Sequence, residues 1–395
     1  MERLGAGGLV CVVLALACGP GAVPAAPAPA STASGGSVGA AAAGVNGAPA
    51  AGSGGAAVAA APSDAAYRQQ VIDGARAEGG EVNILLSSIW TPETLKLLEE
   101  AVERDYGVRL RINRTPSTNY GAHAAQLMSE LQAGATPSYD LHQSSDASSS
   151  LLIQADALEP VNWAALLPPG TPPEVVQGDG RVLVTYTSFN GIMYDPTVVP
   201  ESEAPRSLRD LANPRWRDKV MLASSPDLHM PYVYKWGREP ALEALRAVVQ
   251  NGATTGTFFD QQNRYAAKEV AMIEVSSIIY ASARLRGMPG EFTLLDFADT
   301  TSHQLSVPRR AAHPNSAKLL AAVITGPEGQ AIAAEYIGSS NRYYSGSWEQ
   351  QRQEQANAAG LPTFSWWGEP GALDFLLSPA GEDVRKEINT VLQGG

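Results

Sequence analysis

The pattern of apolar and polar positions predicts strands and helices in alternation from residue 65 onward. Short apolar runs such as 82–86 are followed by stretches in which apolar residues recur every three or four positions, as at Leu95, Leu98 and Val102. We expect strands at 82–86, 108–112, 139–141, 181–186, 191–194, 219–223, 270–275, 293–295 and 303–307, and helices that include 65–77, 119–132, 316–324, 327–337 and 383–392. This alternation predicts an α/β fold with mostly parallel sheets flanked by helices.

The length of the patterned region predicts two lobes rather than one domain. The chain has 395 residues, and the part from Ser63 onward exceeds the usual size of about 100–200 residues for a single domain. The expected divisions are 63–190 for the first part of lobe 1, 191–302 for lobe 2, and 303–395 for the return to lobe 1 and the C-terminal helices. We expect the tail from Ser347 to pack on lobe 1.

The first residues of the chain read as an export signal. An apolar run from Leu9 to Ala17 follows a short head that carries Arg3, and it is shorter than the roughly 20 residues that span a bilayer. Cys18 follows this run directly, which resembles a bacterial lipoprotein signal in which that cysteine becomes the lipid-anchored first residue of the mature protein. The alternative is an ordinary cleaved signal. We expect residues 1–18 to be a signal peptide with an anchor cysteine.

Composition narrows the class of the protein further. Residues 19–62 are almost entirely Ala, Gly, Pro, Ser and Val, which predicts a disordered tether between anchor and fold. The net charge of −12 argues against nucleic acid as a partner. Both cysteines, Cys11 and Cys18, lie in the leader, so none remains for a disulfide, a thiolate nucleophile or a metal site. We expect an exported protein, lipid-anchored on the outer side of the cell membrane or in the periplasm.

Hydroxyl side chains gather where predicted strands meet predicted helices. In open parallel sheets, ligands bind beyond the carboxyl ends of the strands, where helix amino termini offer free N–H groups. Aromatic residues flank the expected cleft, although each serine or aspartate alone could simply cap a helix. The candidate ligand-binding residues are Ser87, Ser88, Trp90, Ser144, Ser145, Asp146, Tyr186, Ser225, Ser276, Ser277 and Tyr280.

Catalytic and metal-binding patterns are scarce. The histidines His123, His142, His229, His303 and His313 are scattered and lack metal-ligand spacing. His142 and His229 stand near predicted strand ends, where a structural role is the more frequent one. Phosphate-loop and paired-cysteine motifs do not occur. We therefore expect a protein that is not an enzyme and that holds neither a cofactor nor a structural metal.

Four segments resemble a known family. Residues 178–196 (GDGRVLVTYTSFNGIMYDP) are similar to the lobe crossing of extracellular solute-binding proteins of ABC importers. Residues 205–223 (PRSLRDLANPRWRDKVMLA) resemble their Pro-x-Ser-Trp-x-Asp-Leu segment, and 312–320 with 326–330 resemble their His-Pro-x-x-Ala-Lys and Ser-Pro-Glu-Gly-Gln pattern. The nearest group is the ferric-iron-binding-like cluster with the type II periplasmic-binding fold.

The resemblance implies two α/β lobes, joined by two crossing strands, that close on a small polar or anionic solute and deliver it to a membrane permease. It implies a monomer. Ferric-iron-binding members carry adjacent tyrosines where the second lobe enters the cleft, whereas Ser276 to Tyr280 contains one tyrosine, and the pair Tyr343-Tyr344 lies elsewhere. Iron binding is therefore the alternative function. A secreted hydrolase on the same fold, with a histidine beside Ser87, Ser144 or Ser276, is less favoured, and a ligand sensor is a third interpretation.

Overall fold

The computed structural model describes residues 63–87, 89–117 and 119–394. The expectations for the signal peptide, Cys18, the tether and Ser88 therefore concern residues outside the described part of the chain. Within that part, none of the helices has the length and apolar character needed to cross a membrane.

The first lobe is built on three parallel strands. They are β1 (Glu81–Ser87), β2 (Arg111–Ser117) and β3 (Leu141–Ser145), in the order β2-β1-β3. Its helices are α1 (Asp64–Ala77), α2 (Pro92–Tyr106), α3 (Tyr120–Gln132), α4 (Asp146–Gln154), α9 (Pro314–Thr325) and α10 (Pro327–Ile332). Apolar residues of α1, α2 and α9 bury the largest core against this sheet, which accounts for the helical periodicity seen at Leu95, Leu98 and Val102.

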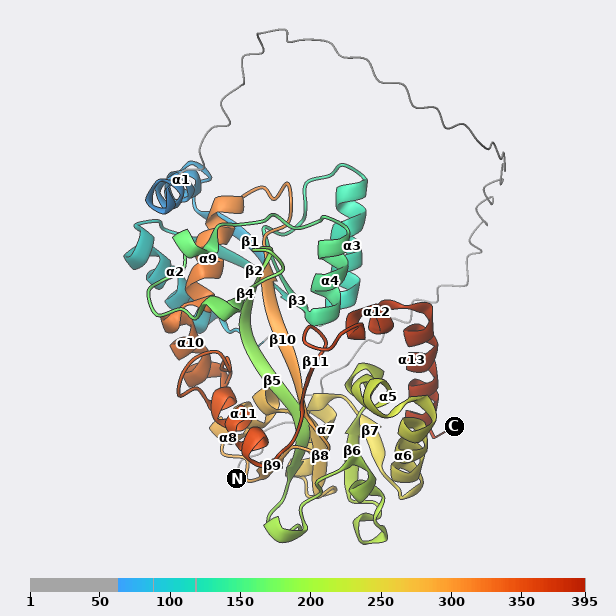
Figure 1. The fold of residues 1–395 in the computed structure, drawn as a ribbon. Helices are drawn as coiled ribbons and strands as arrows, with labels where there is room; N and C mark the ends of the chain where they lie inside the picture. Colours follow the sequence, from blue (N-terminus) through green and yellow to red (C-terminus); the bar gives the residue numbers. More distant parts are fainter. Residues whose placement is uncertain (1–62, 88, 118, 395) are drawn as a thin grey trace, which may run out of the picture. The chain divides into compact units, whose positions relative to one another are not determined.

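Two long strands join the lobes. Figure 1 shows β5 (Val182–Tyr194) and β10 (Ala298–Ser306) running side by side through the middle of the folded part. They pair antiparallel; β10 also pairs with β3 of the first lobe, and β5 also pairs with β8 of the second lobe. The expected cut points at residues 190 and 302 fall within these strands and stay predictions.

The second lobe repeats the layered plan. Its strands are β6 (Val220–Ala223), β7 (Thr254–Gly256), β8 (Met272–Ser276) and β9 (Glu291–Thr293), and its helices are α5 (Met230–Trp236), α6 (Arg238–Gln250), α7 (Phe258–Ala266) and α8 (Ser277–Leu285). Short elements complete the chain: β4 (Val176–Gln177), a π-helical turn (Ala333–Ile337) and 3₁₀ turns at Trp163–Ala165, Pro173–Val175, Glu201–Glu203, Leu208–Ala212, Pro214–Trp216 and Pro226–Leu228. The expected α/β fold of two layered lobes is confirmed.

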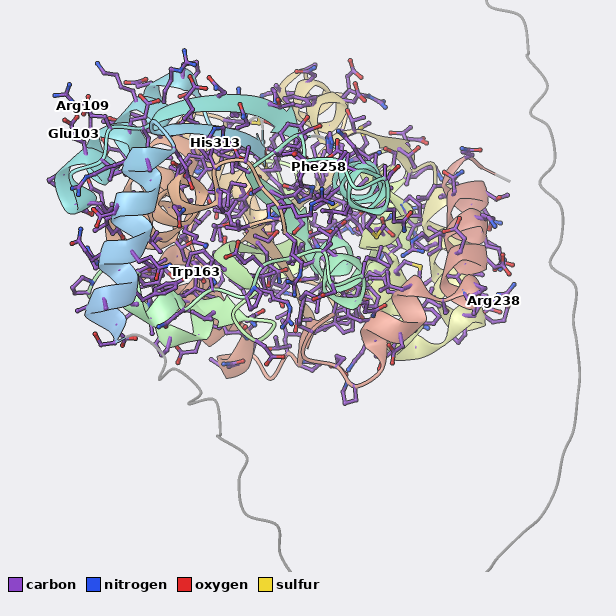
Figure 2. The ribbon with its side chains drawn as sticks, turned by 90° about the horizontal axis from the view of Figure 1, so that it is seen from above. Glu103, Arg109, Trp163, Arg238, Phe258 and His313 are labelled. Carbon is purple, nitrogen blue, oxygen red and sulfur yellow. The ribbon has the colours of Figure 1, made fainter. Side chains whose placement is uncertain are left out.

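The tail packs on the second lobe, so the expectation that it covers the first was wrong. It forms α11 (Trp348–Ala358), β11 (Thr363–Ser365), α12 (Ala372–Leu377) and α13 (Pro379–Leu392). Phe364, Trp366 and Ile388 are buried in the same core as the second-lobe residues, and α13 lies along α6. Arg238 on α6, labelled in Figure 2, donates from Nε to Glu387 Oε2 of α13 at 2.8 Å. The apolar face of α13 thus completes the second-lobe core.

Most strand boundaries differ from the sequence expectation; β10, for example, begins at Ala298 rather than at residue 303. The second strand begins at Arg111 rather than 108, because Val108 and Leu110 are buried but the backbone pairs with β1 only from Arg111. The third strand covers 141–145 instead of 139–141. The runs 181–186 and 191–194 form one continuous strand, β5, since the polar residues between them pair with β10.

Candidate functional site

A row of partly exposed polar side chains crosses the molecule from one lobe to the other. Strand register places them together: His303 pairs with Ser145 of β3, and Asn190 of β5 pairs with Ser276 of β8. Thr301 shares the face of His303 because side chains alternate along a strand. Each of the five is partly exposed. We call Ser145, His303, Thr301, Asn190 and Ser276 the polar row.

The first-lobe end of the row is held by a chain of hydrogen bonds. The Ser87 amide donates to Gln143 Oε1 at 2.6 Å, and Gln143 Nε2 donates to the Tyr186 hydroxyl at 2.8 Å. The Tyr186 ring stacks on His303, with ring centroids 4.3 Å apart. The Tyr120 hydroxyl, at the start of α3, lies 3.3 Å from His303 Nδ1. The imidazole is therefore fixed on one ring face and at one nitrogen.

These groups are uncharged near neutral pH. The His303 ring packs between the rings of Tyr120 and Tyr186. This burial lowers the pKa of His303 to about 4. Burial raises the pKa of Tyr120 to about 12 and that of Tyr186 well above its usual value. The first-lobe end therefore offers neutral donors and acceptors of hydrogen bonds rather than fixed charges.

The middle of the row is oriented by a buried carboxyl. Asn190 Nδ2 donates to Asp299 Oδ2 at 2.7 Å and to Thr301 Oγ1 at 3.4 Å. Asp299 is only 6% exposed, and burial raises its pKa to about 7. Since both amide hydrogens point toward these partners, Asn190 can present its carbonyl oxygen to the open side.

Asp146 and Ser144, both expected at the site, lie behind the row instead. The Asp146 side chain is buried, where Oδ2 accepts from the Ser302 amide at 3.2 Å and Oδ1 accepts from Gln304 Nε2 at 3.1 Å. The hydroxyls of Ser144 and Ser149 are 2.5 Å apart and also buried. Ser302 and Gln304 alternate with the row residues Thr301 and His303, so these contacts brace the opposite side of β10.

Of the second-lobe candidates, Ser276 belongs to the polar row, whereas Ser277 and Tyr280 lie away from it. Ser277 is fully buried, accepts from the Phe189 amide at 2.9 Å and donates to Glu349 Oε1 at 2.7 Å. Tyr280 packs in a separate hydrophobic cluster, where its ring stacks on Trp348 at 5.5 Å. Both serve the contact between α8 and the tail.

The remaining expected residues are spread over the molecule. Trp90 is buried in the first-lobe core and Ser225 is exposed at the start of a 3₁₀ turn. The structure thus brings together Ser87, Ser145, Tyr186 and Ser276, and it does not bring Trp90, Ser144, Asp146, Ser225, Ser277 or Tyr280 to the row. Their role as ligand contacts stays a prediction.

Sequence reasoning missed five residues of this region: Tyr120, Gln143, Asn190, Thr301 and His303. The available signal was the alternation along the crossing strands, which assigns every second residue of β5 and β10 to the same face.

Other histidines and acids form no comparable centre. His229 Nε2 lies 3.2 Å from the Ala223 carbonyl oxygen, and His313 Nδ1 lies 2.9 Å from Asp140 Oδ2. Among residues 63–87, 89–117 and 119–394, no group of three or more His, Cys, Asp or Glu side chains is placed to hold a metal ion. In the same ranges, none of the hydrogen bonds joins a histidine to Ser87, Ser144 or Ser276.

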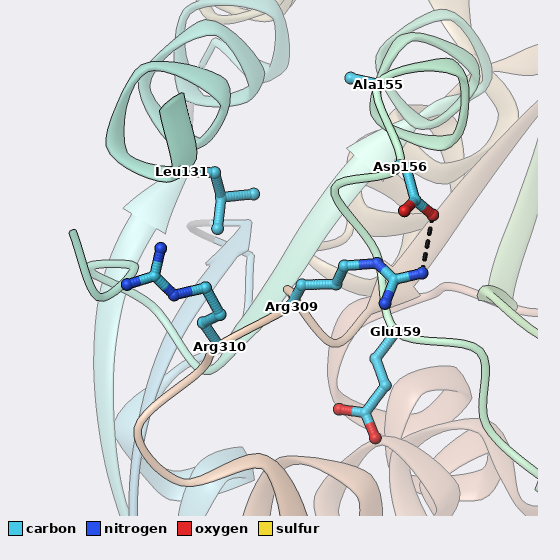
Figure 3. A pocket seen from close by; sticks show the side chains of 6 residues that line it. All are labelled: Leu131, Ala155, Asp156, Glu159, Arg309 and Arg310. Carbon is cyan, nitrogen blue, oxygen red and sulfur yellow. Dashed lines mark hydrogen bonds and ion pairs between the residues drawn. The ribbon is translucent and has the colours of Figure 1, made fainter. Parts of the chain in front are cut away.

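A hollow of about 520 Å³ opens elsewhere on the first lobe (Figure 3). It is lined by Leu131, Ala155, Asp156, Glu159, Arg309 and Arg310. Arg309 donates to Asp156 at 2.7 Å. Leu131 lies near the end of α3 while Tyr120 begins that helix, so this hollow and the polar row lie toward opposite ends of α3.

Solved structures of two transport proteins have the same fold. Iron-bound HitA from Pseudomonas aeruginosa is 17% identical, with a TM-score of 0.56 over 80% of this chain and 98% of that one. PotD of a spermidine/putrescine ABC transporter from Streptococcus pneumoniae is also 17% identical, with a TM-score of 0.56 over 77% and 99%. Such identities support the type II periplasmic-binding fold alone. A search of curated proteins found no match.

A family model settles the relationship. The model for bacterial extracellular solute-binding proteins matches residues 98–341, which is more than half of the chain and includes both crossing strands. This region also contains the whole polar row. The chain therefore belongs to the bacterial extracellular solute-binding protein family.

Proposed function

We propose that this protein is the solute receptor of an ABC importer and that it holds a small polar solute against the polar row. The observation that carries the proposal is the continuity of the row: Ser145 belongs to the first lobe, Ser276 to the second, and His303, Thr301 and Asn190 to the strands that connect them. A solute bound here touches both lobes and the hinge at once.

The chemistry of the row favours an uncharged hydrogen-bonding site. Three of its side chains are hydroxyls, one is an amide and one is a neutral imidazole. A pocket built from such groups selects a solute by the placement of its polar atoms, because each unpaired polar group inside a closed cleft costs about 1–3 kcal/mol.

Closure of the lobes would couple capture to delivery. A ligand that contacts both lobes binds the closed state more tightly, and so shifts the population toward that state. β5 and β10 are the connections about which such a movement would occur, and β11 adds a third strand beside β10. The closed form would then be recognised by a membrane permease.

The remaining parts of the proposal concern location and partners. An exported location follows the family, and we propose that lipidated Cys18 anchors the protein and that residues 19–62 act as its tether. We propose a monomer that transports rather than transforms its solute, without nucleic acid as a partner.

Ferric iron is the second candidate cargo, since the similar structures include iron-bound HitA and a Trichodesmium IdiA (FutA) in complex with iron and citrate. The hydroxyls of Tyr120 and Tyr186 lie beside each other and are the candidate phenolate ligands for such an iron. Their raised pKa values oppose ionisation, and Fe(III) favours several anionic oxygen ligands. We therefore favour an organic solute.

The test is a thermal-shift panel on the full chain with ferric citrate, phosphate esters, phosphonates, thiamine, polyamines and sugars. A ligand that binds only the folded state raises the unfolding midpoint by mass action. One organic class should raise it. A shift with ferric citrate that free citrate does not reproduce would favour iron, and a midpoint unmoved by every class would contradict solute capture.

A further inference from the structure

The hydrogen bonds behind His303 have a fixed direction. The chain starts at the Ser87 backbone amide, which can only donate, so Gln143 must turn its carbonyl oxygen Oε1 toward it at 2.6 Å. Gln143 then has only its NH₂ group left for Tyr186, and this group donates to the Tyr186 hydroxyl at 2.8 Å. One backbone group thereby orients the amide, and the amide orients the next member.

Two tyrosine hydroxyls lie between Gln143 and His303. The Tyr186 oxygen already accepts from Gln143, which leaves its own O–H to donate, and the hydroxyls of Tyr120 and Ser87 both lie beside it. The Tyr120 hydroxyl lies 3.3 Å from His303 Nδ1, and a phenol O–H beside an imidazole nitrogen that carries no proton fits an O–H···Nδ1 hydrogen bond. Donation from Tyr186 to Tyr120 would carry the direction set at Ser87 to the imidazole and leave the Tyr120 O–H to donate to Nδ1.

We propose that His303 carries its ring proton on Nε2 and presents this N–H to a solute oxygen that accepts hydrogen bonds, such as that of a carboxylate, phosphate or carbonyl group. The inference rests on the proposed function and names the substrate class of the same site. A neutral imidazole with Nδ1 accepting from Tyr120 has its single proton on Nε2. That nitrogen has no protein partner among the described residues, and the ring is partly exposed on the polar row. Polyamines, whose charged nitrogens only donate, are disfavoured.

The tautomer can be measured without any ligand. In the full chain with ¹⁵N-labelled histidine, long-range ¹H–¹⁵N correlation at about pH 7 distinguishes a protonated Nε2 from a protonated Nδ1. The His303→Gln variant identifies the His303 signals by their loss. A protonated Nε2 supports the inference, and a protonated Nδ1 overturns it.

Tyr120→Phe separates positioning from simple packing. This change keeps the aromatic ring and removes the O–H donor at Nδ1, so we expect the His303 signals to move toward a mixture of tautomers. Unchanged signals would mean that Tyr120 does not set the tautomer and would overturn the relay. Tyr139→Phe is a matched control, because Tyr139 contacts His123 rather than His303.

Binding tests the substrate class. The probes are citrate and glycerol 3-phosphate, which carry oxygen acceptors, and spermidine, which carries only donors when charged. We expect the first pair to raise the unfolding midpoint and to bind about tenfold more weakly to His303→Met, with much of the loss restored in His303→Gln, whose amide can donate from a similar position. A response to spermidine alone, or equal affinity of His303→Met, would overturn the inference.

The failures of the two proposals differ. If Nδ1 is protonated while citrate or the phosphate ester still binds, the tautomer inference fails and solute capture stands. If Nε2 is protonated but every probe and the wider panel leave the midpoint unchanged, solute capture fails, and the substrate class falls with it.

Discussion

Replacing Asp146 by asparagine tests the protonation of a buried carboxyl behind the hinge strands. Asp146 is 1% exposed, and its oxygens accept from the Ser302 amide and from Gln304 Nε2. Burial raises its pKa from 3.8 to about 7, and this effect outweighs the hydrogen bond from Ser302 and the charge of Arg342, which both act in the opposite direction. The folded protein therefore keeps a proton on this carboxyl that the unfolded chain has already lost.

The sign and size of the effect follow from this difference. Because the folded pKa lies above the unfolded one, stability from this group is fully present below about pH 4 and is lost as the pH rises to about 7. The interval between the two pKa values corresponds to an upper limit of about 4 kcal/mol. The side chain introduced by Asp146→Asn cannot ionise, so the variant lacks this decline. The variant should become more stable than wild type as the pH approaches 8.

Urea unfolding followed by tryptophan fluorescence at several pH values from about 5 to 8 measures the effect. The stability difference between variant and wild type should grow by about 1.4 kcal/mol per pH unit up to about pH 7 and then level off. The contributions of Asp299 and Glu349 are common to both proteins and cancel to first order. Asp179→Asn is the control, since that carboxylate is 98% exposed. A difference that stays constant with pH would refute the reasoning.

Three further changes test the packing around the hinge. Phe364→Ala removes a fully buried ring from the second-lobe core and should lower the unfolding free energy by about 3–5 kcal/mol in urea titrations; a loss below about 1 kcal/mol would contradict the place of the tail in that core. Gly191→Ala would put a methyl group 2.4 Å from the Thr293 carbonyl oxygen, so we expect a loss of about 1–3 kcal/mol in the same assay, and an unchanged midpoint would be inconsistent with this close approach. Ser277→Ala leaves Glu349 without its hydroxyl partner and should cost about 2 kcal/mol at pH 8 and less at pH 5, where the carboxyl is protonated; a cost independent of pH would count against this contact.

The order of strands and helices could be predicted because it depends on local patterns. Apolar runs and capping residues such as Thr91 lie within a few positions of the element that they specify. The predicted strand boundaries were less accurate where an edge strand carries few apolar residues. β2 is such a case, since its residues Arg111, Asn113 and Thr115 face solvent.

The site was only partly predictable because strand register is not a local property. Ser144 and Ser145 are adjacent in sequence and looked equivalent, yet they point to opposite faces of β3. Only Ser145 pairs with His303 and joins the row. No local sequence motif identifies His303, because its partners Tyr120 and Tyr186 are far away along the chain.

The place of the tail could not be predicted from its own sequence. The apolar faces of α12 and α13 indicate burial but do not say against which lobe. The pairing of β11 with β10 directs the chain to the second lobe, and this pairing depends on backbone contacts that carry little sequence signal.

The most direct test of the central claim compares ligand affinity in a row variant and a matched control. Thr301→Val combined with Ser276→Ala removes two row hydroxyls, one from a crossing strand and one from the second lobe, and Thr115→Val makes the same threonine change at an exposed position of β2. Calorimetric titration of the solute found in the thermal-shift panel should show affinity at least roughly tenfold weaker in the row variant and unchanged in the control. Equal affinity in wild type and row variant would contradict solute binding at the polar row.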